Sequence, residues 1–285
     1  MNLHRRLLKH ICPLVLMVLM VGCGLSTSSD NSAYRHVFLE EEARLVDADN
    51  SPFCDFAIDF TYLKEVDSIA VRMNHAIQRE FLGNDYETLA PEMAVDSFKN
   101  VYLADYRKEV GVIFEEEREK ASSEDEIPAW FSQTYSLVTF VEEGRSGVIN
   151  ATANYFVDMG GAHPHQWSRW LNFDFVTGRM LAKDEVFHLE AGADIETILL
   201  NKLISMQAEA HPDMQVNSLE DLQNMGFLQH TNMFIPDNFL VSKRAMLFLF
   251  NRYDIAPYSE GEIVIEVPYE EIGHYLKINC NGTDY

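Results

Sequence analysis

The sequence predicts an α+β fold, built as two intimately packed α+β modules with antiparallel sheets. Segments with helical periodicity and segments with strand-like alternation occur in blocks, without the regular βαβ alternation of a parallel sheet. Short glycine-containing loops join several of the β-rich segments, as in hairpins. At 285 residues, the chain is long enough for one large domain or two small ones.

The N-terminal residues 1–22 have the pattern of a signal peptide. Arg5, Arg6 and Lys9 precede an apolar run over residues 11–21. This run is shorter than the roughly 20 residues that a bilayer-spanning helix needs, so we expect a cleaved leader. Residues 19–23, LMVGC, resemble a bacterial lipobox, which predicts lipidation at Cys23. The alternative is an ordinary signal peptide cleaved nearby.

Lipidation at Cys23 would make the protein a lipoprotein of the bacterial cell envelope, facing the periplasm or the cell surface and held to the membrane by its lipid anchor. The residues that follow are rich in serine and then in acidic residues. We therefore assign residues 23–50 to a lipidated tether, residues 51–165 to an N-terminal module and residues 166–285 to a C-terminal module.

The N-terminal module is predicted to combine one strand, two helices and a hairpin. Alternation predicts a strand over residues 53–63, and a helical period follows over residues 66–81. Pro91 suits the first position of a second helix, which we extend to about residue 120. A hairpin is expected between residues 131 and 157, because two β-rich segments flank a glycine-containing loop.

The C-terminal module begins with another predicted strand, over residues 171–175. A long helix over residues 191–210 and a short helix over residues 218–224 follow. Three strands are then expected, and a final helix closes the module. These last four elements are placed at residues 239–241, 245–250, 262–267 and 269–276.

The chain is strongly acidic. Its formal net charge is −23, and loss of the three leader cations would make it −26. Such a charge disfavours nucleic acid and anionic lipid head groups as partners. It would attract a cationic protein, although an acidic surface kept for solubility is the simpler explanation.

Two cysteines remain after cleavage and lipidation. Cys54 and Cys280 lie near the two ends of the predicted folded region, in an oxidising compartment where a disulfide is stable. Two separate buried thiols are the alternative.

The stretch from Asp158 to His165 is the strongest candidate for chemistry. Asp158, His163 and His165 are residue types that bind zinc. No HExxH motif, cysteine pair or GxSxG motif accompanies them. We therefore expect a tight turn formed by Gly160 and Gly161, no metal, no cofactor and no catalytic activity. An envelope hydrolase or metal-dependent enzyme that uses this loop is the alternative.

Aromatic residues near this loop are better candidates for ligand contact, because they supply large rigid surfaces that dominate recognition. We select His163, Trp167 and Tyr258 as binding residues. Trp170 and Tyr253 are weaker candidates, and core packing is expected for Trp170.

Two stretches resemble the extracellular domain of anti-sigma-V factor (RsiV-like) proteins, a family also found ahead of the catalytic domain in some peptidoglycan deacetylases. Residues 160–181 read GGAHPHQWSRWLNFDFVTGRML, and residues 253–272 read YDIAPYSEGEIVIEVPYEEI. In the anti-sigma proteins this domain binds lysozyme outside the cell. The resemblance implies a binding module here, with a protein ligand such as cationic lysozyme or a cell-wall glycan.

Overall fold

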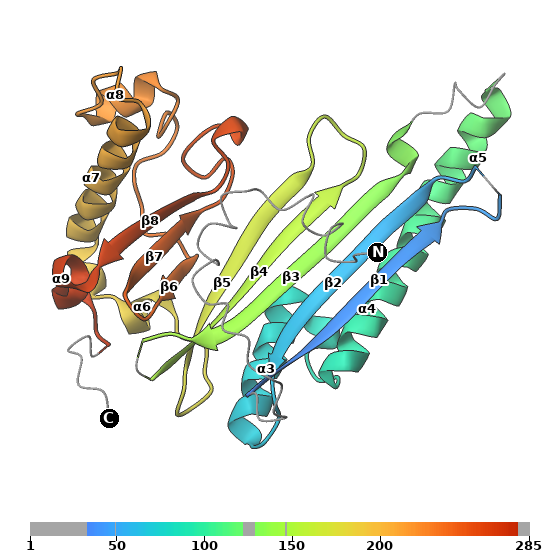
Figure 1. Ribbon diagram of the computed structural model, residues 1–285, viewed down its shortest axis with the longest axis horizontal. Helices are drawn as coiled ribbons and strands as arrows, with labels where there is room; N and C mark the ends of the chain where they lie inside the picture. The colour runs from blue at the N-terminus through green and yellow to red at the C-terminus, as the bar shows by residue number, and fades with distance from the viewer. Residues whose placement is uncertain (1–32, 49, 122–128, 146, 279–285) are drawn as a thin grey trace, which may run out of the picture.

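The computed structural model describes residues 33–48, 50–121, 129–145 and 147–278. Its α+β architecture confirms the predicted fold class (Figure 1). A five-stranded mixed sheet of order β1-β2-β3-β4-β5 forms the first module, and a three-stranded antiparallel sheet of order β6-β7-β8 forms the second. The strands are β1 (Tyr34–Arg44), β2 (Phe53–Leu63), β3 (Gln133–Glu143), β4 (Val148–Asp158), β5 (His165–Asp174), β6 (Phe239–Val241), β7 (Ala245–Phe250) and β8 (Ile263–Pro268).

Helices cover one face of the first sheet and flank the second. In the first module these are α3 (Ser68–Phe81), α4 (Pro91–Asp105), a π-helical turn η2 (Tyr106–Val110) and α5 (Gly111–Lys120), with the 3-10 helices η1 (Asn84–Tyr86) and η4 (Ala129–Phe131). In the second they are α6 (Lys183–Val186), α7 (Gly192–Ala210), α8 (Leu219–Asn224) and α9 (Tyr269–Ile272), with the 3-10 helices η5 (Leu189–Ala191), η6 (Tyr258–Glu260) and η7 (Gly273–Tyr275).

The ends of α3 follow from local chemistry. The Asp67 side chain caps the helix by accepting hydrogen bonds from the backbone N–H groups of Ile69 and Ala70. Gly83, at a φ of 116°, follows the last turn and lets the chain leave the helix. The apolar face of α3, including Met73 and Ile77, packs into the first core.

One pairing in the first sheet differs from the antiparallel sheets that we predicted. β2 and β3 run parallel, with Phe56 opposite Tyr135. Parallel neighbours need a long crossover connection, and α3, α4 and α5 provide it. The sequence shows each strand but not its partner, so this pairing was not foreseen.

The structure moves two predicted boundaries. β1 lies within the predicted tether of residues 23–50, so the fold begins before residue 51. As an edge strand, β1 buries little apolar surface, which is why its pattern resembled a tether. β5 begins at the predicted module boundary of residues 165 and 166, yet it pairs with β4 along its length and belongs to the first sheet. The second module therefore begins after β5.

Two separate cores support the two-module description. The first core lies between the five-stranded sheet and its helices and includes Phe56, Met73 and Phe173. The second core includes Phe187, Leu199 and Phe248. The open edge of β5 faces the second module, so the junction between the modules lies along this strand.

Candidate ligand-binding surface at the module junction

Two loops from different modules meet at the junction. The first is the β4–β5 turn of residues 159–164, and the second is the β7–β8 loop of residues 251–262. A hydrogen bond from the Tyr258 hydroxyl to the carbonyl oxygen of Pro164, 2.9 Å long, joins them. The two stretches that resemble the RsiV-like family therefore touch in space.

The β4–β5 turn is tight because Gly160 occupies it. The backbone N–H of Gly160 donates to the Asp158 carboxylate over 2.8 Å, and its φ is 71°. A Cβ at this position would lie 2.2 Å from the Cα of Trp130. Only glycine fits this close approach, in agreement with the predicted turn.

His163 and Tyr258, two of the three predicted binding residues, lie together. Their rings stack with centroids 4.8 Å apart and an interplanar angle of 21°. The β4–β5 turn thereby places an imidazole against the phenol ring of the opposite loop.

Arg252 holds the β7–β8 loop in place, and sequence reasoning missed it. Its guanidinium lies 4.4 Å from the Tyr258 ring centroid. It donates to the carbonyl oxygen of Tyr258 over 2.7 Å and to the Gln166 side chain over 2.6 Å. A cation directly before the YDIAPY stretch of an acidic chain was the signal that could have identified this residue. Arg252 makes Tyr258 a fixed part of the junction.

Tyr253 is the more exposed of the two tyrosines on this surface. Its side chain is 70 % exposed, and its ring centroid lies 5.8 Å from that of Tyr258. Its backbone has a φ of 70°, a left-handed conformation that is costly for a tyrosine. Leu228 also has a positive φ, but it is buried and its N–H donates to Ile255. Burial does not explain the strained backbone of Tyr253.

A partly buried polar cluster underlies the junction. The Ser168 hydroxyl oxygen lies 2.8 Å from both Asn154 Oδ1 and Glu262 Oε1. Burial raises the pKa of Glu262, although the Ser168 hydrogen bond and the charge of Arg252 act in the opposite direction. Partial desolvation also raises the pKa of Asp254 in the same loop, although the hydrogen bond from the Asn251 N–H acts in the opposite direction.

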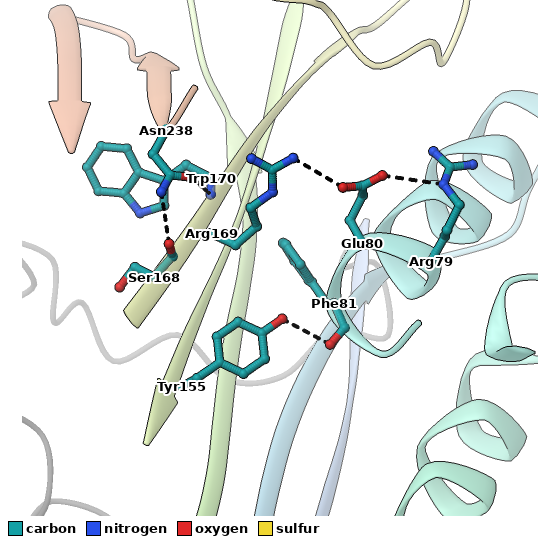
Figure 2. A network of polar contacts seen from close by, with 8 residues as sticks. All are labelled: Arg79, Glu80, Phe81, Tyr155, Ser168, Arg169, Trp170 and Asn238. Carbon is teal, nitrogen blue, oxygen red and sulfur yellow. Dashed lines mark hydrogen bonds and ion pairs between the residues drawn. The ribbon is translucent and has the colours of Figure 1, made fainter. Parts of the chain in front are cut away.

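Asparagine side chains bind the open edge of β5 to the second module. The N–H of Trp170 donates to Asn238 Oδ1, and Asn238 Nδ2 donates to the carbonyl oxygen of Ser168, both over 3.0 Å (Figure 2). Asn251 bonds to the N–H and the carbonyl oxygen of Ser168. These side-chain amides form hydrogen bonds with backbone groups of β5 that a neighbouring strand would otherwise pair with. The backbone of Trp170 thus belongs to the module joint, while its indole is half-buried.

Trp167, the third predicted binding residue, lies elsewhere. Its neighbours along β5, Gln166 and Ser168, contact the β7–β8 loop. Successive side chains of a strand point to opposite faces, so the Trp167 side chain points to the other face of the sheet. Its ring stacks on Tyr155 with centroids 4.5 Å apart, and its side chain is 38 % exposed. The Tyr155 hydroxyl donates to the carbonyl oxygen of Phe81, at the end of α3 (Figure 2).

Beside this stack, Glu80 of α3 bridges Arg79 and Arg169. Its carboxylate oxygens lie 3.3 Å from Arg79 Nε and 3.2 Å from Arg169 Nη2 (Figure 2). Trp167 therefore belongs to the face that joins β5 to α3, apart from the surface formed by His163, Tyr253 and Tyr258.

Two residues of the alternative metal site that the sequence offered make other contacts in the structure. Asp158 accepts the Gly160 N–H, and His163 stacks on Tyr258. Within the described residues, no three histidine, cysteine, aspartate or glutamate side chains converge as metal ligands.

Cys54 is fully buried in β2. Burial, and to a smaller extent Asp55, raise the pKa of its thiol to about 12, so the unreactive thiol form dominates. Cys280, its predicted disulfide partner, and Cys23, the predicted lipidation site, lie outside the described residues. In the part of the chain that the structure describes, no helix combines the length and the apolar character that crossing a membrane requires.

The second module is related to known proteins. Residues 185–270 match a family model described as "Protein of unknown function (DUF3298)". This part of the chain is therefore similar to DUF3298 domains. The match starts near α6 and ends in α9, so it covers the second module and includes the loop that carries Tyr253 and Tyr258.

Two crystal structures are similar to this chain over both modules. A DUF3298 family member from Bacteroides fragilis NCTC 9343 is 26% identical and has a TM-score of 0.78, covering 86% of this chain and 94% of the other. A DUF3298 family protein from Pseudomonas aeruginosa PAO1 is 16% identical and has a TM-score of 0.57, covering 86% and 95%, and shares the fold. No curated protein matches the chain.

Proposed function

We propose that this protein is a lipid-anchored, non-catalytic binding protein of the bacterial envelope that recognises a protein or cell-wall glycan ligand. The leader and the lipobox-like LMVGC sequence support the location and the anchor. The resemblance to the RsiV-like family supports the binding role and makes lysozyme the first ligand to test.

The observation that carries the proposal is the conformation of Tyr253. A tyrosine in the left-handed region costs about 1–3 kcal/mol, and such strain is concentrated at functional sites. Here the strained residue presents a large aromatic side chain that is 70 % exposed, beside the stacked rings of His163 and Tyr258. Rigid exposed aromatics of this kind anchor many protein and glycan ligands.

Charge supports a cationic ligand. The formal net charge of −26 after leader removal would steer a basic protein such as lysozyme toward the surface. Steering alone is abolished by salt, whereas contacts with the aromatic surface persist.

The test is calorimetric titration of the purified protein with lysozyme at low and high salt. We expect saturable binding at both, weakened about tenfold or more by Tyr253→Gly. Glycine adopts a φ of 70° without strain, so this variant should melt at the same temperature as the parent or higher. Loss of binding in a protein of undiminished stability separates recognition from folding.

Two control variants locate the surface. Phe175→Ala removes an aromatic that is 58 % exposed outside the junction and should bind normally. Trp167→Ala tests the predicted binding residue that lies on the other face of β5. Normal binding by Tyr253→Gly together with weak binding by Trp167→Ala would move the site to that face. Absence of lysozyme binding at high salt would reject this ligand.

A further inference from the structure

β1 is an eleven-residue strand at the edge of the first sheet. The N–H of Lys64 donates to the carbonyl oxygen of Ala33, so the odd-numbered residues of β1 direct their backbone groups toward β2. Backbone groups alternate along an antiparallel strand. The backbone groups of His36, Phe38, Glu40 and Glu42 therefore point away from β2, along the outer edge of the sheet.

The side chains of this edge are arranged in a self-complementary order. Basic residues occupy its first part, an aromatic residue follows, and acidic residues occupy the remainder: Arg35, His36, Phe38, Glu40, Glu41 and Glu42. An antiparallel copy of the strand reverses this order. Arg35 then faces a glutamate across the pair, and so does His36, which carries a positive charge only when it is protonated. Opposite charges in these positions stabilise strand pairing.

We propose that β1 pairs with β1 of a second copy of this chain, antiparallel and about a two-fold axis at Phe38. In this register His36 lies opposite Glu40 of the other copy, Arg35 lies opposite Glu41, and Val37 lies opposite Leu39. Phe38, which is 39 % exposed, packs against its own copy. The two five-stranded sheets become one continuous sheet. This inference stands independently of the proposed ligand.

Other registers are less favourable. An axis at Glu40 places two glutamates directly opposite each other, which is destabilising. An axis at Leu39 places the apolar Phe38 and Val37 opposite the charged Glu40 and Glu41, so that neither pair gains a favourable contact. Charged residues on edge strands generally prevent pairing with unrelated strands. Here they also select the register about Phe38.

The helix layer is compatible with this axis. α4 packs against both β1 and β2, so a two-fold axis perpendicular to the sheet places α4 of both copies on the same face. Lys99 of α4 lies 3.0 Å from Glu41 and 3.4 Å from Asp96, which balances the acidic side chains beside the axis. On the other face His36 lies 3.5 Å from Asp59 within its own chain and keeps a 71% exposed side chain.

A cysteine scan tests the register. Hydrogen-bonded antiparallel residues have Cα atoms about 5.5 Å apart, within the range for a disulfide. In the full-length protein purified in detergent, Phe38→Cys should form a disulfide-linked dimer under a mild oxidant. His36→Cys and Glu40→Cys are the matched controls, because each would lie about 14 Å from its own copy. An equimolar mixture of the two controls should cross-link.

Charge exchange tests the pairing energy. Glu40→Lys should raise the dimer dissociation constant, measured by sedimentation velocity, about tenfold. The double variant His36→Glu with Glu40→Lys should restore it. Unchanged melting temperatures would show that these exposed substitutions leave the monomer folded. A monomeric mass at every concentration, equal cross-linking at all three positions, or a maximum at Glu40 would overturn the proposal.

Discussion

The two modules share a plan of helices packed with a sheet, but their cores differ in chemistry. The first core buries Tyr106, Tyr135 and Tyr155, and Phe56 contacts Phe98, Tyr102 and Tyr135 there. The second core is formed mainly by phenylalanine and aliphatic residues, as in the contacts of Phe187 with Phe239 and Phe248. A buried phenol is stable only while it is neutral, so alkaline pH can destabilise the first core. The second core lacks this sensitivity where phenylalanine takes the place of tyrosine.

The joint between the modules differs from both cores. It relies on amide side chains, chiefly Asn172, Asn238 and Asn251, and on the contacts of Arg252. Hydrogen bonds of side-chain amides fix the relative orientation of the two modules but bury little apolar surface. We therefore expect two stable units joined by a directional but weaker connection.

The largest expected effect comes from Phe56→Ala, which should lower the free energy of unfolding by about 3–5 kcal/mol because it empties the centre of the aromatic cluster. All three tryptophans, Trp130, Trp167 and Trp170, belong to the first module. Tryptophan fluorescence during urea unfolding therefore reports this module. Phe248→Ala in the second core is the matched variant and should shift the fluorescence transition less. Equal shifts would show a single cooperative unit.

A smaller effect is expected from Asn172→Ala. Its amide donates to the Phe239 carbonyl oxygen and accepts from the Val241 N–H, both over 2.8 Å, and also accepts from Asn150. Losing these buried bonds should cost about 1–3 kcal/mol. The fluorescence and circular dichroism transitions should also separate. The exposed Asn201→Ala in α7 serves as the control. Coincident transitions in Asn172→Ala would contradict a joint that depends on this amide.

The smallest effect concerns alkaline pH. Burial raises the pKa of Tyr62 to about 12, with a further contribution from Glu92, and raises the pKa values of Tyr102 and Tyr135. Unfolded phenols ionise near pH 10, so above this pH the unfolded state binds fewer protons than the folded state. Stability of the first module should therefore fall as pH rises from about 10 toward 12.

Tyr102→Phe removes one of these phenols and should reduce the alkaline loss. The measurement is the urea midpoint of the fluorescence transition at a series of pH values, compared with that of the parent. An unchanged pH dependence would assign the alkaline loss to other groups.

Much of the fold was predictable because its elements carry strong patterns. The predicted strand of residues 53–63 and helix of residues 191–210 correspond to β2 and α7. β1 was missed because an edge strand exposes one face and buries few apolar residues. The parallel pairing of β2 with β3 was missed because pairing depends on where the crossover returns the chain, which local periodicity does not encode.

The candidate surface was predictable only in part. The aromatic residues were visible in the sequence, and His163 does meet Tyr258. Trp167 was grouped with them because it is near in sequence, whereas strand alternation sends it to the opposite face. Asn238, Asn251 and Arg252 resembled ordinary loop residues, since their importance arises from the edge of β5 that they contact.

The parallel pair of β2 and β3 also sets an order of folding. β1 with β2, and β3 with β4 and β5, are neighbours in sequence and can pair early through short loops. The contact between Phe56 and Tyr135 closes a far longer loop, which slows its formation. A chain that folds from its N-terminus would hold β1 and β2 as a hairpin without the rest of the sheet until the helices and β3 are added. During that interval the side of β2 that pairs with β3 is exposed, which makes it the part of the sheet most open to misfolding.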